Sequence, residues 1–453
     1  MIVIAGGGIT GLAAAFELAQ RGVDFLLFEA APHLGGLIRT EHAGGFTIDA
    51  GPDSLLAQKP AAIQLCDAIG LSAQLMPTKP PRTAFVLRGG RLYPLPSPSV
   101  LGIPTSLAAL RRYDLLDWPA RVRVAMEPFV GIEPSGDESV AAFFRRRFGA
   151  STVDLIAEPL LGGIHAGDVE QLSMSSVFPR LIDAARQPGG VARNLGGAPR
   201  ATGDGLFRAL RGGMGDLVNG IERSLPPQSV HTSTPVTGVE RAGAGWTVTA
   251  GARRIDCAAV LLATPAHAAA RLVRPIDSEA AQLCASVPYV STTSVALAWK
   301  RAEVAHPLAG SGFVVARRYN DARITACTWV SSKWEHRAPA DRVLIRAFAG
   351  GAHDPRAVDL HDGQLIEMAI RDLTPILGIS AAPSLTRVFR ARDAGAQHHV
   401  GHAARIATLT RRLSATPGLF VAGSGFESIG IPDCVANGRR VAAAAADYVR
   451  MGS

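Results

Sequence analysis

The sequence predicts an α/β fold, α+β overall, with a Rossmann-like nucleotide-binding domain assembled from separated segments of the chain. Residues 2–28 have the pattern of a strand, a glycine-rich turn, a helix and a second strand. Residues 417–445 repeat the order of strand, glycine-rich turn and helix. Between these ends, apolar residues follow the period of strands at 229–262 and 290–350, and of helices at 97–195. We therefore expect a mixed-sheet substrate domain and a helical insertion between the two nucleotide-binding ends.

The elements of the first unit follow from their residue types. Residues 2–5 and 24–28 are short apolar runs, typical of buried parallel strands. Residues 11–20 are strong helix formers, and Gly22 ends the helix. Further along the chain, we expect a helix at 60–70, a hairpin at 84–96 turning at Gly89-Gly90, helices at 108–127 and 139–161, and strands at 236–239, 246–249, 258–262, 294–299 and 323–329.

The composition excludes several classes of protein. The chain has 453 residues, 47% of them hydrophobic and 19% charged, which favours a large core over wholesale disorder. Its five cysteines are scattered and form no C-x-x-C pair, so we predict neither a disulfide framework nor a metal site. The chain begins in a strand rather than a basic leader and contains no run of 18 apolar residues, so we expect a cytoplasmic protein.

The basic residues are unusual in kind. The net charge is +8, and lysine occurs only at Lys59, Lys79, Lys300 and Lys333, so arginine supplies most of the 46 basic residues. Two explanations stay open: a bias in genome composition, or a surface or cleft that attracts carboxylates. Because the basic residues are spread along the chain without interleaved aromatic residues, we expect no nucleic-acid partner.

The strongest local motif is Gly6-Gly7-Gly8-Ile9-Thr10-Gly11, which fits G-x-G-x-x-G between a strand and a helix. Its glycines allow a tight turn and the close approach of a pyrophosphate, which the start of the helix favours. Glu29 ends the second strand, directly before Ala30, where a carboxylate can bind ribose hydroxyls. The motif predicts a dinucleotide site; a glycine-rich turn that binds nothing is the alternative.

Two further turns follow the second strand. Gly35 and Gly36 form a second glycine pair, beside which Arg39 reaches the pyrophosphate or the flavin ring; an ordinary loop and a solvated arginine are the alternatives. Gly51-Pro52-Asp53-Ser54 is a tight turn with free backbone donors. Asp53 or Ser54 is also a candidate helix cap, a role compatible with cofactor binding.

Two later segments are expected at the same cofactor. Thr264 follows a buried strand that would pass the adenine half, unless the chain simply leaves the sheet there. Gly423 and Gly430-Ile431-Pro432 bring a second helix N-terminus, whose dipole would stabilise an anionic reduced flavin. Cys434 fits a packed residue better than a nucleophile. Because no second G-x-G-x-x-G is available for NAD, the sequence favours FAD.

Three longer stretches, residues 49–56, 158–168 and 426–434, carry a resemblance to a known family. The chain resembles the protoporphyrinogen and coproporphyrinogen oxidases, within the FAD-linked amine-oxidase and phytoene-desaturase superfamily, over essentially its whole length. Four other stretches are more similar to the coproporphyrinogen oxidases of Gram-positive-type haem synthesis: 101–105, 312–317, 324–329 and 333–336.

The resemblance implies three regions. The FAD-binding domain would comprise residues 1–80, 203–275 and 385–453, and the substrate-binding domain 81–96 and 276–384. Residues 97–202 would form a helical domain, which in relatives can touch membranes, so peripheral contact with the inner face of a membrane is possible. The stretch 395–402 departs from the family pattern, because a proline and an aromatic residue are missing, and this puts the shape of a pocket wall near the flavin in question.

The resemblance also implies site residues. FAD contacts carry over to Gly6, Gly8, Gly11, Glu29, Gly36, Arg39, Gly51, Pro52, Asp53, Ser54, Val236, Thr264, Gly430, Ile431 and Pro432. Substrate contacts carry over to Lys59, Ile164, Gly312, Val314 and Phe348. For Ile164, Val314 and Phe348, plain core packing is the alternative. The sequence reveals no acid–base pair, so no catalytic residue is predicted.

The implied activity is the FAD-dependent oxidation of a porphyrinogen by molecular oxygen, with coproporphyrinogen III as the expected substrate. Each of three steps would move a hydride from a bridge carbon to the flavin, and catalysis would rest on positioning the macrocycle. Protoporphyrinogen IX is the alternative substrate. Less favoured are an oxidase of amines or carotenoid precursors and a binding protein that has lost the flavin.

Overall fold

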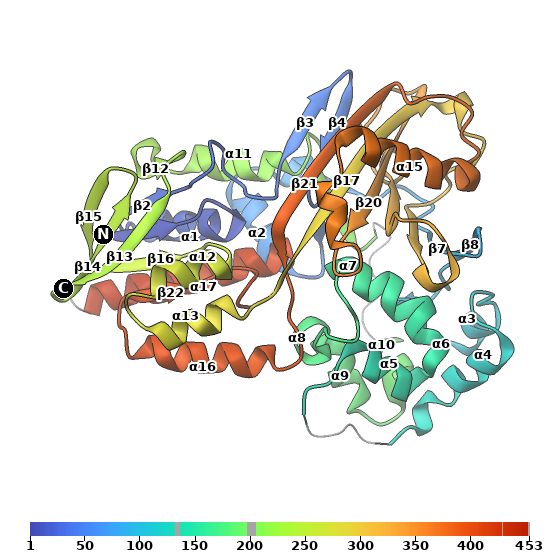
Figure 1. Cartoon of the computed structure of the whole chain (residues 1–453), viewed down its shortest axis with the longest axis horizontal. Helices are drawn as coiled ribbons and strands as arrows, with labels where there is room; N and C mark the ends of the chain where they lie inside the picture. Colours follow the sequence, from blue (N-terminus) through green and yellow to red (C-terminus); the bar gives the residue numbers. More distant parts are fainter. Residues whose placement is uncertain (132–135, 197–204, 428, 452–453) are drawn as a thin grey trace.

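A parallel five-stranded sheet is the centre of the nucleotide-binding region (Figure 1). The computed structural model describes residues 1–131, 136–196, 205–427 and 429–451. The strand order is β12 (Val230–His231), β2 (Phe25–Phe28), β1 (Ile2–Ala5), β16 (Ala259–Leu262) and β22 (Leu419–Val421). The sheet unites three distant parts of the chain, which confirms the predicted assembly from separated segments.

Helices and a small sheet cover the two faces of this parallel sheet. Ile2 and Ile4 face a core formed with α1 (Ile9–Gln20), α2 (Pro60–Ala68), α11 (Gly215–Ser224) and α17 (Ile431–Met451). Val3 and Ala5 face the opposite core, because successive strand residues point to opposite faces. That core is completed by α12 (Ala266–Val273), α13 (Ser278–Ala285), α16 (His402–Ser414) and the antiparallel strands β13 (Val236–Ala242), β14 (Gly245–Ala250) and β15 (Arg253–Cys257).

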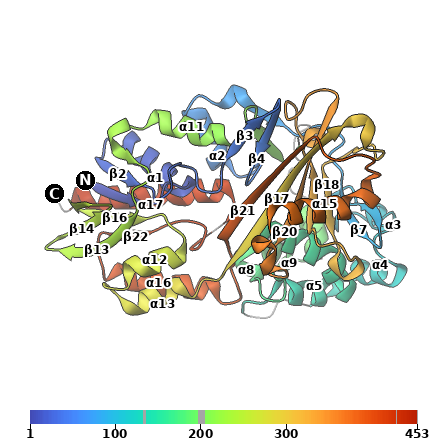
Figure 2. The same cartoon turned by 45° about the horizontal axis from the view of Figure 1, so that its top comes forward.

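A mixed seven-stranded sheet forms the second region, beside the first (Figure 1). Its order is β21 (Leu385–Ala396), β17 (Tyr289–Lys300), β20 (Arg342–Gly350), β19 (Ala326–Trp329), β18 (Gly312–Val315), β7 (Ala84–Arg88) and β8 (Arg91–Pro94). α15 (Asp362–Leu377) covers one face (Figure 2). The sequence prediction assigned β21 to the nucleotide-binding domain, but β21 pairs with β17. We therefore place the start of the last nucleotide-binding segment after Ala396.

The third region is helical and lies below the seven-stranded sheet in Figure 1. The single helix expected at 139–161 is interrupted at Gly149, whose φ of +97° leaves helical geometry. A wide π-helix then runs over Val153–Gly162 and contains Pro159. The other helices are α3 (Leu107–Arg111), α4 (Trp118–Ala125), α5 (Val140–Phe148), α6 (Ala150–Thr152), α7 (Gly163–His165), α8 (Met174–Val177), α9 (Pro179–Ala185) and α10 (Gly190–Gly196). The predicted boundary at 202/203 lies outside the described residues.

Short elements connect the regions. The predicted hairpin at 84–96 is present as β7 and β8, with its turn at Gly89-Gly90. The strand expected at 323–329 is shorter than predicted, since β19 begins at Ala326. The remaining elements are β3 (Thr40–Ala43), β4 (Phe46–Asp49), β5 (Leu55–Leu56), β6 (Leu75–Pro77), β9 (Ser99–Val100), β10 (Ile103–Pro104), β11 (Phe207–Leu210) and α14 (Val330–Lys333).

Several large apolar side chains of the helical region are exposed. Trp118 is 75% exposed and Phe129 85%, and Leu107, Val122 and Met126 are exposed beside them in the sequence. In the described part of the chain, no helix combines the length and apolar character needed to cross a bilayer. The peripheral membrane contact stays a prediction.

Candidate cofactor and active site

The glycine motif forms the turn from β1 into α1. Gly6 has a φ of +105°, and a Cβ there would press against the carbonyl of Ala263 on the neighbouring strand exit. A Cβ at Gly11 would overlap the carbonyl oxygen of Gly6. A Cβ at Gly8 would meet nothing within 4 Å. Gly6 and Gly11 are therefore required by packing, whereas the backbone of Gly8 stays open to a ligand.

Glu29 ties this turn to the end of β2. Its Oε2 accepts a hydrogen bond from the N–H of Gly7 at 2.6 Å, and its Oε1 accepts one from the N–H of Ala31 at 2.7 Å. A carboxylate oxygen can accept two hydrogen bonds, so each oxygen keeps a position for a ribose hydroxyl. The Glu29 carbonyl accepts from Thr234 N–H, which places the segment before Val236 beside the same turn.

The second glycine pair lies against the first turn. Gly35 forms an isolated parallel bridge with Gly8, and a Cβ at Gly36 would lie 3.4 Å from the Gly8 Cα. Arg39 follows two residues after the exposed Leu37, and its own side chain is exposed. The glycines are thus brought to the predicted cofactor site, while the role of Arg39 stays a prediction.

The N-termini of α1 and α17 meet at one place. A Cβ at Gly438 would overlap the carbonyl of Thr10, so the two helices cross in close backbone contact. The Gly423 N–H donates to Asn437 Oδ1 at 2.8 Å, which fixes the turn after β22 against α17. Ile431 and Pro432 are the first residues of α17.

Cys434 and Lys59 take positions beside this crossing. Burial raises the pKa of the Cys434 thiol to about 11, which disfavours a nucleophilic thiolate and supports the packing interpretation. The Nζ of Lys59 lies 2.5 Å from Asp433 Oδ2 at the start of α17, and the predicted contact of Lys59 with the substrate stays a prediction. Lys59 therefore joins the region after the 51–54 turn to α17, and 42% of its side chain remains exposed.

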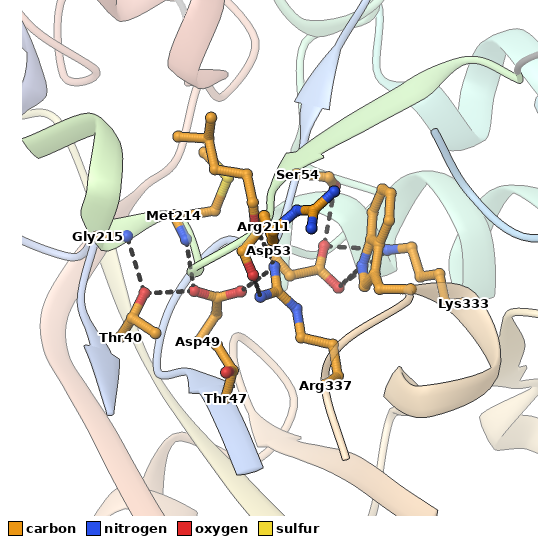
Figure 3. Close-up of polar contacts among 12 residues, drawn as sticks. Thr40, Thr47, Asp49, Asp53, Ser54, Arg211, Met214, Gly215, Lys333 and Arg337 are labelled. Atoms are coloured by element: carbon orange, nitrogen blue, oxygen red, sulfur yellow. Dashed lines mark hydrogen bonds and ion pairs between the residues drawn. The ribbon is translucent and has the colours of Figure 1, made fainter. Parts of the chain in front are cut away.

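Asp53 joins the turn at 51–54 to Lys333 and Trp334, at the end of α14 (Figure 3). Both carboxylate oxygens of Asp53 lie 3.0 Å from Lys333 Nζ, and Trp334 Nε1 donates to Oδ2 at 3.3 Å. Burial opposes ionisation of Asp53, but Lys333 and Arg346 outweigh it and hold the pKa of Asp53 well below its usual range. Asp53 is therefore an anion in a fixed ion pair rather than a helix cap.

Asp49 anchors the other end of that turn (Figure 3). Its Oδ1 accepts from Thr40 Oγ1 at 2.6 Å and from Met214 N–H at 2.7 Å, and its Oδ2 lies 3.3 Å from Arg337 Nη2. Arg337 is fully buried and also donates to the Leu210 carbonyl at 3.0 Å. These bonds hold β4, α11 and the segment after α14 as one rigid support.

One face of the seven-stranded sheet carries most of the predicted substrate residues. Val314 pairs with Ala326, which pairs with Phe348, so these three side chains share a face. Gly312 shares it, because its partner Thr328 pairs with Arg346. Gly312 and Val314 line a cavity of about 350 Å³, together with residues of all three regions that include Arg82, Phe85, Leu160, Phe207, Thr328 and Lys333.

Ile164 and Phe348 do not line this cavity. Ile164 lies on α7 and is 61% exposed, and its contact with the substrate stays a prediction. Phe348 packs under the guanidinium of Arg346, 4.5 Å from the ring centre. Sequence reasoning missed Lys333 as a cavity residue and Arg346 altogether; a charged residue within the apolar strand pattern of 342–350 was the available signal.

The chain matches known proteins over nearly its whole length. The model of the family described as flavin containing amine oxidoreductase matches residues 9–446. The chain belongs to this family. Coproporphyrinogen III oxidase of Bacillus subtilis (strain 168) is 35% identical over 99% of this chain and 98% of its own length. Chloroplastic protoporphyrinogen oxidase 1 of Spinacia oleracea is 26% identical over 99% of this chain and 84% of its own length.

A solved structure agrees with this assignment. A protein from Exiguobacterium sp. 255-15 described as a protoporphyrinogen oxidase has a TM-score of 0.87 and 31% identity, covering 98% of each chain. These matches confirm the resemblance to the coproporphyrinogen and protoporphyrinogen oxidases and the predicted fold class. The chain is thus an FAD-dependent oxidoreductase of this flavin family.

The residues present fit FAD. No side chain caps the start of α1 in the described part of the chain, so its first-turn N–H groups are free for a pyrophosphate. The Oγ1 of Thr264 is buried and has no hydrogen-bond partner among the described residues. Because a buried hydroxyl without a partner is costly, a ligand at this strand exit is the natural acceptor or donor. The individual FAD contacts stay predictions.

The departing stretch 395–402 contains a buried histidine pair in contact with the C-terminal glycine-rich turn. The rings of His398 and His402 stack with centroids 3.9 Å apart, and both residues are almost fully buried. His398 Nε2 lies 2.8 Å from the Ser424 carbonyl, so this nitrogen carries the proton. The Ser173 N–H donates to the His398 carbonyl, which ties the helical region to the flavin region. The altered stretch thus packs against the turn at 423–425, which is predicted to contact FAD.

These histidines are expected to make the protein acid-sensitive. Burial lowers the pKa of His402 to about 3, with His398 and Arg405 adding to the effect, and burial lowers that of His165 to about 4. Below the unfolded pKa near 6.5, only the unfolded chain binds these protons, so stability falls as pH falls towards the folded pKa values. Between pH 6.5 and 5, each histidine should remove roughly 2 kcal/mol from the free energy of unfolding.

Urea unfolding at pH 7 and pH 5 measures this effect. His402→Phe keeps the stacked packing and removes the titrating group, so its loss of stability between the two pH values should be smaller than the parent's. His336→Gln alters an exposed histidine, so its free energy of unfolding should fall between pH 7 and pH 5 by as much as the parent's. An equal pH dependence in all three proteins would contradict the assignment to His402.

Proposed function

We propose that this chain converts coproporphyrinogen III into coproporphyrin III in haem biosynthesis. Six hydrogens leave the macrocycle in three two-electron steps, and three molecules of oxygen become three molecules of hydrogen peroxide. FAD supplies the two-electron chemistry of each step. Support comes from the likeness to coproporphyrinogen III oxidases over nearly the whole chain. We place the reaction in the cytoplasm.

The observation that carries the proposal is the cavity at the junction of the three regions. Its walls combine the apolar side chains of Phe85, Leu160 and Phe313 with two basic side chains, Arg82 and Lys333, of which Lys333 is also paired with Asp53. Apolar walls exclude water from a flat macrocycle, and cations bind its carboxylates. The chain's own contribution is to bind and orient the ring, because no acid–base pair lines this cavity among the described residues.

Protoporphyrinogen IX is the second candidate substrate. It has two propionates where coproporphyrinogen III has four, so a cavity with cationic walls favours the latter. An amine oxidase or a carotenoid-precursor oxidase has less support, since coproporphyrinogen III oxidases are 29–35% identical to the chain over nearly its whole length. A binding protein without flavin is opposed by the open Gly8 backbone and the orphaned Thr264 hydroxyl.

Anaerobic reduction of the bound flavin tests the substrate. Mixed with the holoprotein, coproporphyrinogen III should bleach the flavin absorbance at least roughly tenfold faster than protoporphyrinogen IX, as a few carboxylate contacts of ordinary strength would give. Admission of oxygen should then restore the flavin and release about three hydrogen peroxide per porphyrin. Faster bleaching by protoporphyrinogen IX would reverse the substrate assignment, and bleaching by neither would refute the proposed activity.

A further inference from the structure

Arg346 lies on a strand of the substrate sheet, but its guanidinium reaches into the flavin region. Its Nη2 donates to the Gly51 carbonyl at 2.7 Å, and its Nη1 donates to the Asp49 carbonyl. The residue is only 6% exposed. Its Nε is buried and has no partner among the described residues. The guanidinium therefore holds the backbone of residues 49–51 by two hydrogen bonds, and this segment leads into the turn predicted to contact FAD.

The buried charges around this turn do not cancel. Asp49 pairs with Arg337 and Asp53 pairs with Lys333, so each carboxylate already has its own cation (Figure 3). Arg346 donates to neutral carbonyls in the hydrogen bonds that the structure shows. Two carboxylates and three cations leave one positive charge in excess within this group.

A buried charge without a counter-ion is costly. Burial lowers the pKa of Arg346 despite the attraction of Asp53 and Asp49. Asp49 and Asp53 already pair with Arg337 and Lys333, so they do not supply the missing counter-ion. A further anion next to the turn would lower the cost of burying the Arg346 charge. The site therefore favours a ligand that is negatively charged, or becomes so.

The flavin ring of FAD meets that requirement only after it is reduced, whereas the pyrophosphate is charged in both states and is expected at the start of α1. A neutral oxidised flavin ring that gains two electrons and one proton from a reductant bears one negative charge, and the reductant's second proton goes to solvent. We propose that Arg346 is a positioning residue that fixes the 51–54 turn against the flavin ring and favours reduced over oxidised FAD through its charge. The inference depends on FAD binding and not on which substrate is oxidised.

The test measures the reduction potential of bound FAD with a chemical reductant and a reference dye, without porphyrinogen or oxygen. Arg346→Met removes the charge at similar size, and it should weaken binding of reduced FAD relative to oxidised FAD by roughly tenfold, about 30 mV for a two-electron couple. Arg346→Lys keeps the charge and should stay close to the parent. Asp53→Asn removes a negative charge and should shift the potential in the opposite direction.

The signs separate electrostatics from a purely structural role. Loss of packing would shift the reduction potential of bound FAD in the same direction in Arg346→Met and Asp53→Asn. The proposal requires shifts in opposite directions. Arg254→Met, an exposed change on β15, is the matched control and should match the parent. A parent-like potential in Arg346→Met, or shifts of one sign, would overturn the proposal. If Arg346→Met binds no FAD, the other two variants decide. A reduction potential like the parent's in Arg346→Lys together with a higher potential in Asp53→Asn supports the proposal, and any other pair of results overturns it.

Discussion

Replacing Gly8 with alanine should leave the apoprotein stable while weakening FAD binding roughly tenfold or more. Gly8 has a φ of −68°, which alanine adopts without strain, and its Cβ position meets nothing within 4 Å. The free energy of unfolding of the apoprotein should therefore stay within about 0.5 kcal/mol of the parent. The added methyl group would occupy space that a pyrophosphate needs at the start of α1, so the loss should appear in the FAD dissociation constant.

Gly11→Ala is the matched control, because its methyl group would overlap the Gly6 carbonyl inside the turn itself. This variant should lose roughly 1–3 kcal/mol of apoprotein stability as well as FAD affinity. Fluorescence titration with FAD and urea unfolding of the flavin-free proteins separate the two effects. Parent-like FAD affinity in Gly8→Ala would mean that the pyrophosphate does not lie over this turn.

The glycine turn was predictable because its determinants are local. Gly6, Gly8, Gly11 and Glu29 lie within one β-α-β unit, and the spacing alone implies their geometry. The joining of the two chain ends was also within reach, since both ends repeat strand, turn and helix. Such patterns are read from a few consecutive residues.

Contacts between distant residues could not be derived in this way. Asp53 and Lys333 each lie in a stretch that resembles the family, but 280 positions separate them, and nothing in either stretch specifies the partner. Arg346 sits in an apolar strand, where the pattern predicts only burial. The exposure of Ile164 was not predictable either, because apolar character does not reveal which face of a short helix turns inward.

The widened helix at 153–162 shows a different limit. Its apolar spacing predicted an ordinary helix, and the sequence marks Gly149 and Pro159 only as possible breaks. The π-helix packs against α5 and continues into α7. Such geometry is fixed by tertiary contacts and not by local propensity.

A buried ion pair should dominate the stability of the helical region. Glu127 is fully buried, and its Oε1 accepts from Arg147 Nη1 at 3.0 Å and from the Val191 N–H at 3.0 Å. Arg147 is 1% exposed and donates to the Ala185 carbonyl at 2.6 Å. Glu127→Ala would remove a buried carboxylate that pairs with Arg147 and would leave the Val191 N–H without this acceptor, so we expect a loss of roughly 3–5 kcal/mol in the free energy of unfolding.

The exposed pair of Arg254 and Glu240 provides the comparison. Glu240→Ala removes the same type of partner at the surface and should cost less than about 1 kcal/mol. If the penalty in Glu127→Ala arises from loss of the buried ion pair with Arg147, the double variant Glu127→Leu/Arg147→Met should recover much of the lost free energy of unfolding, because both members of the pair are replaced by apolar side chains. A double variant as unstable as Glu127→Ala would instead assign the loss to packing around η2 (the short helix Glu127–Phe129), α5 and α10, and the ion pair would then contribute specificity of contact rather than stability.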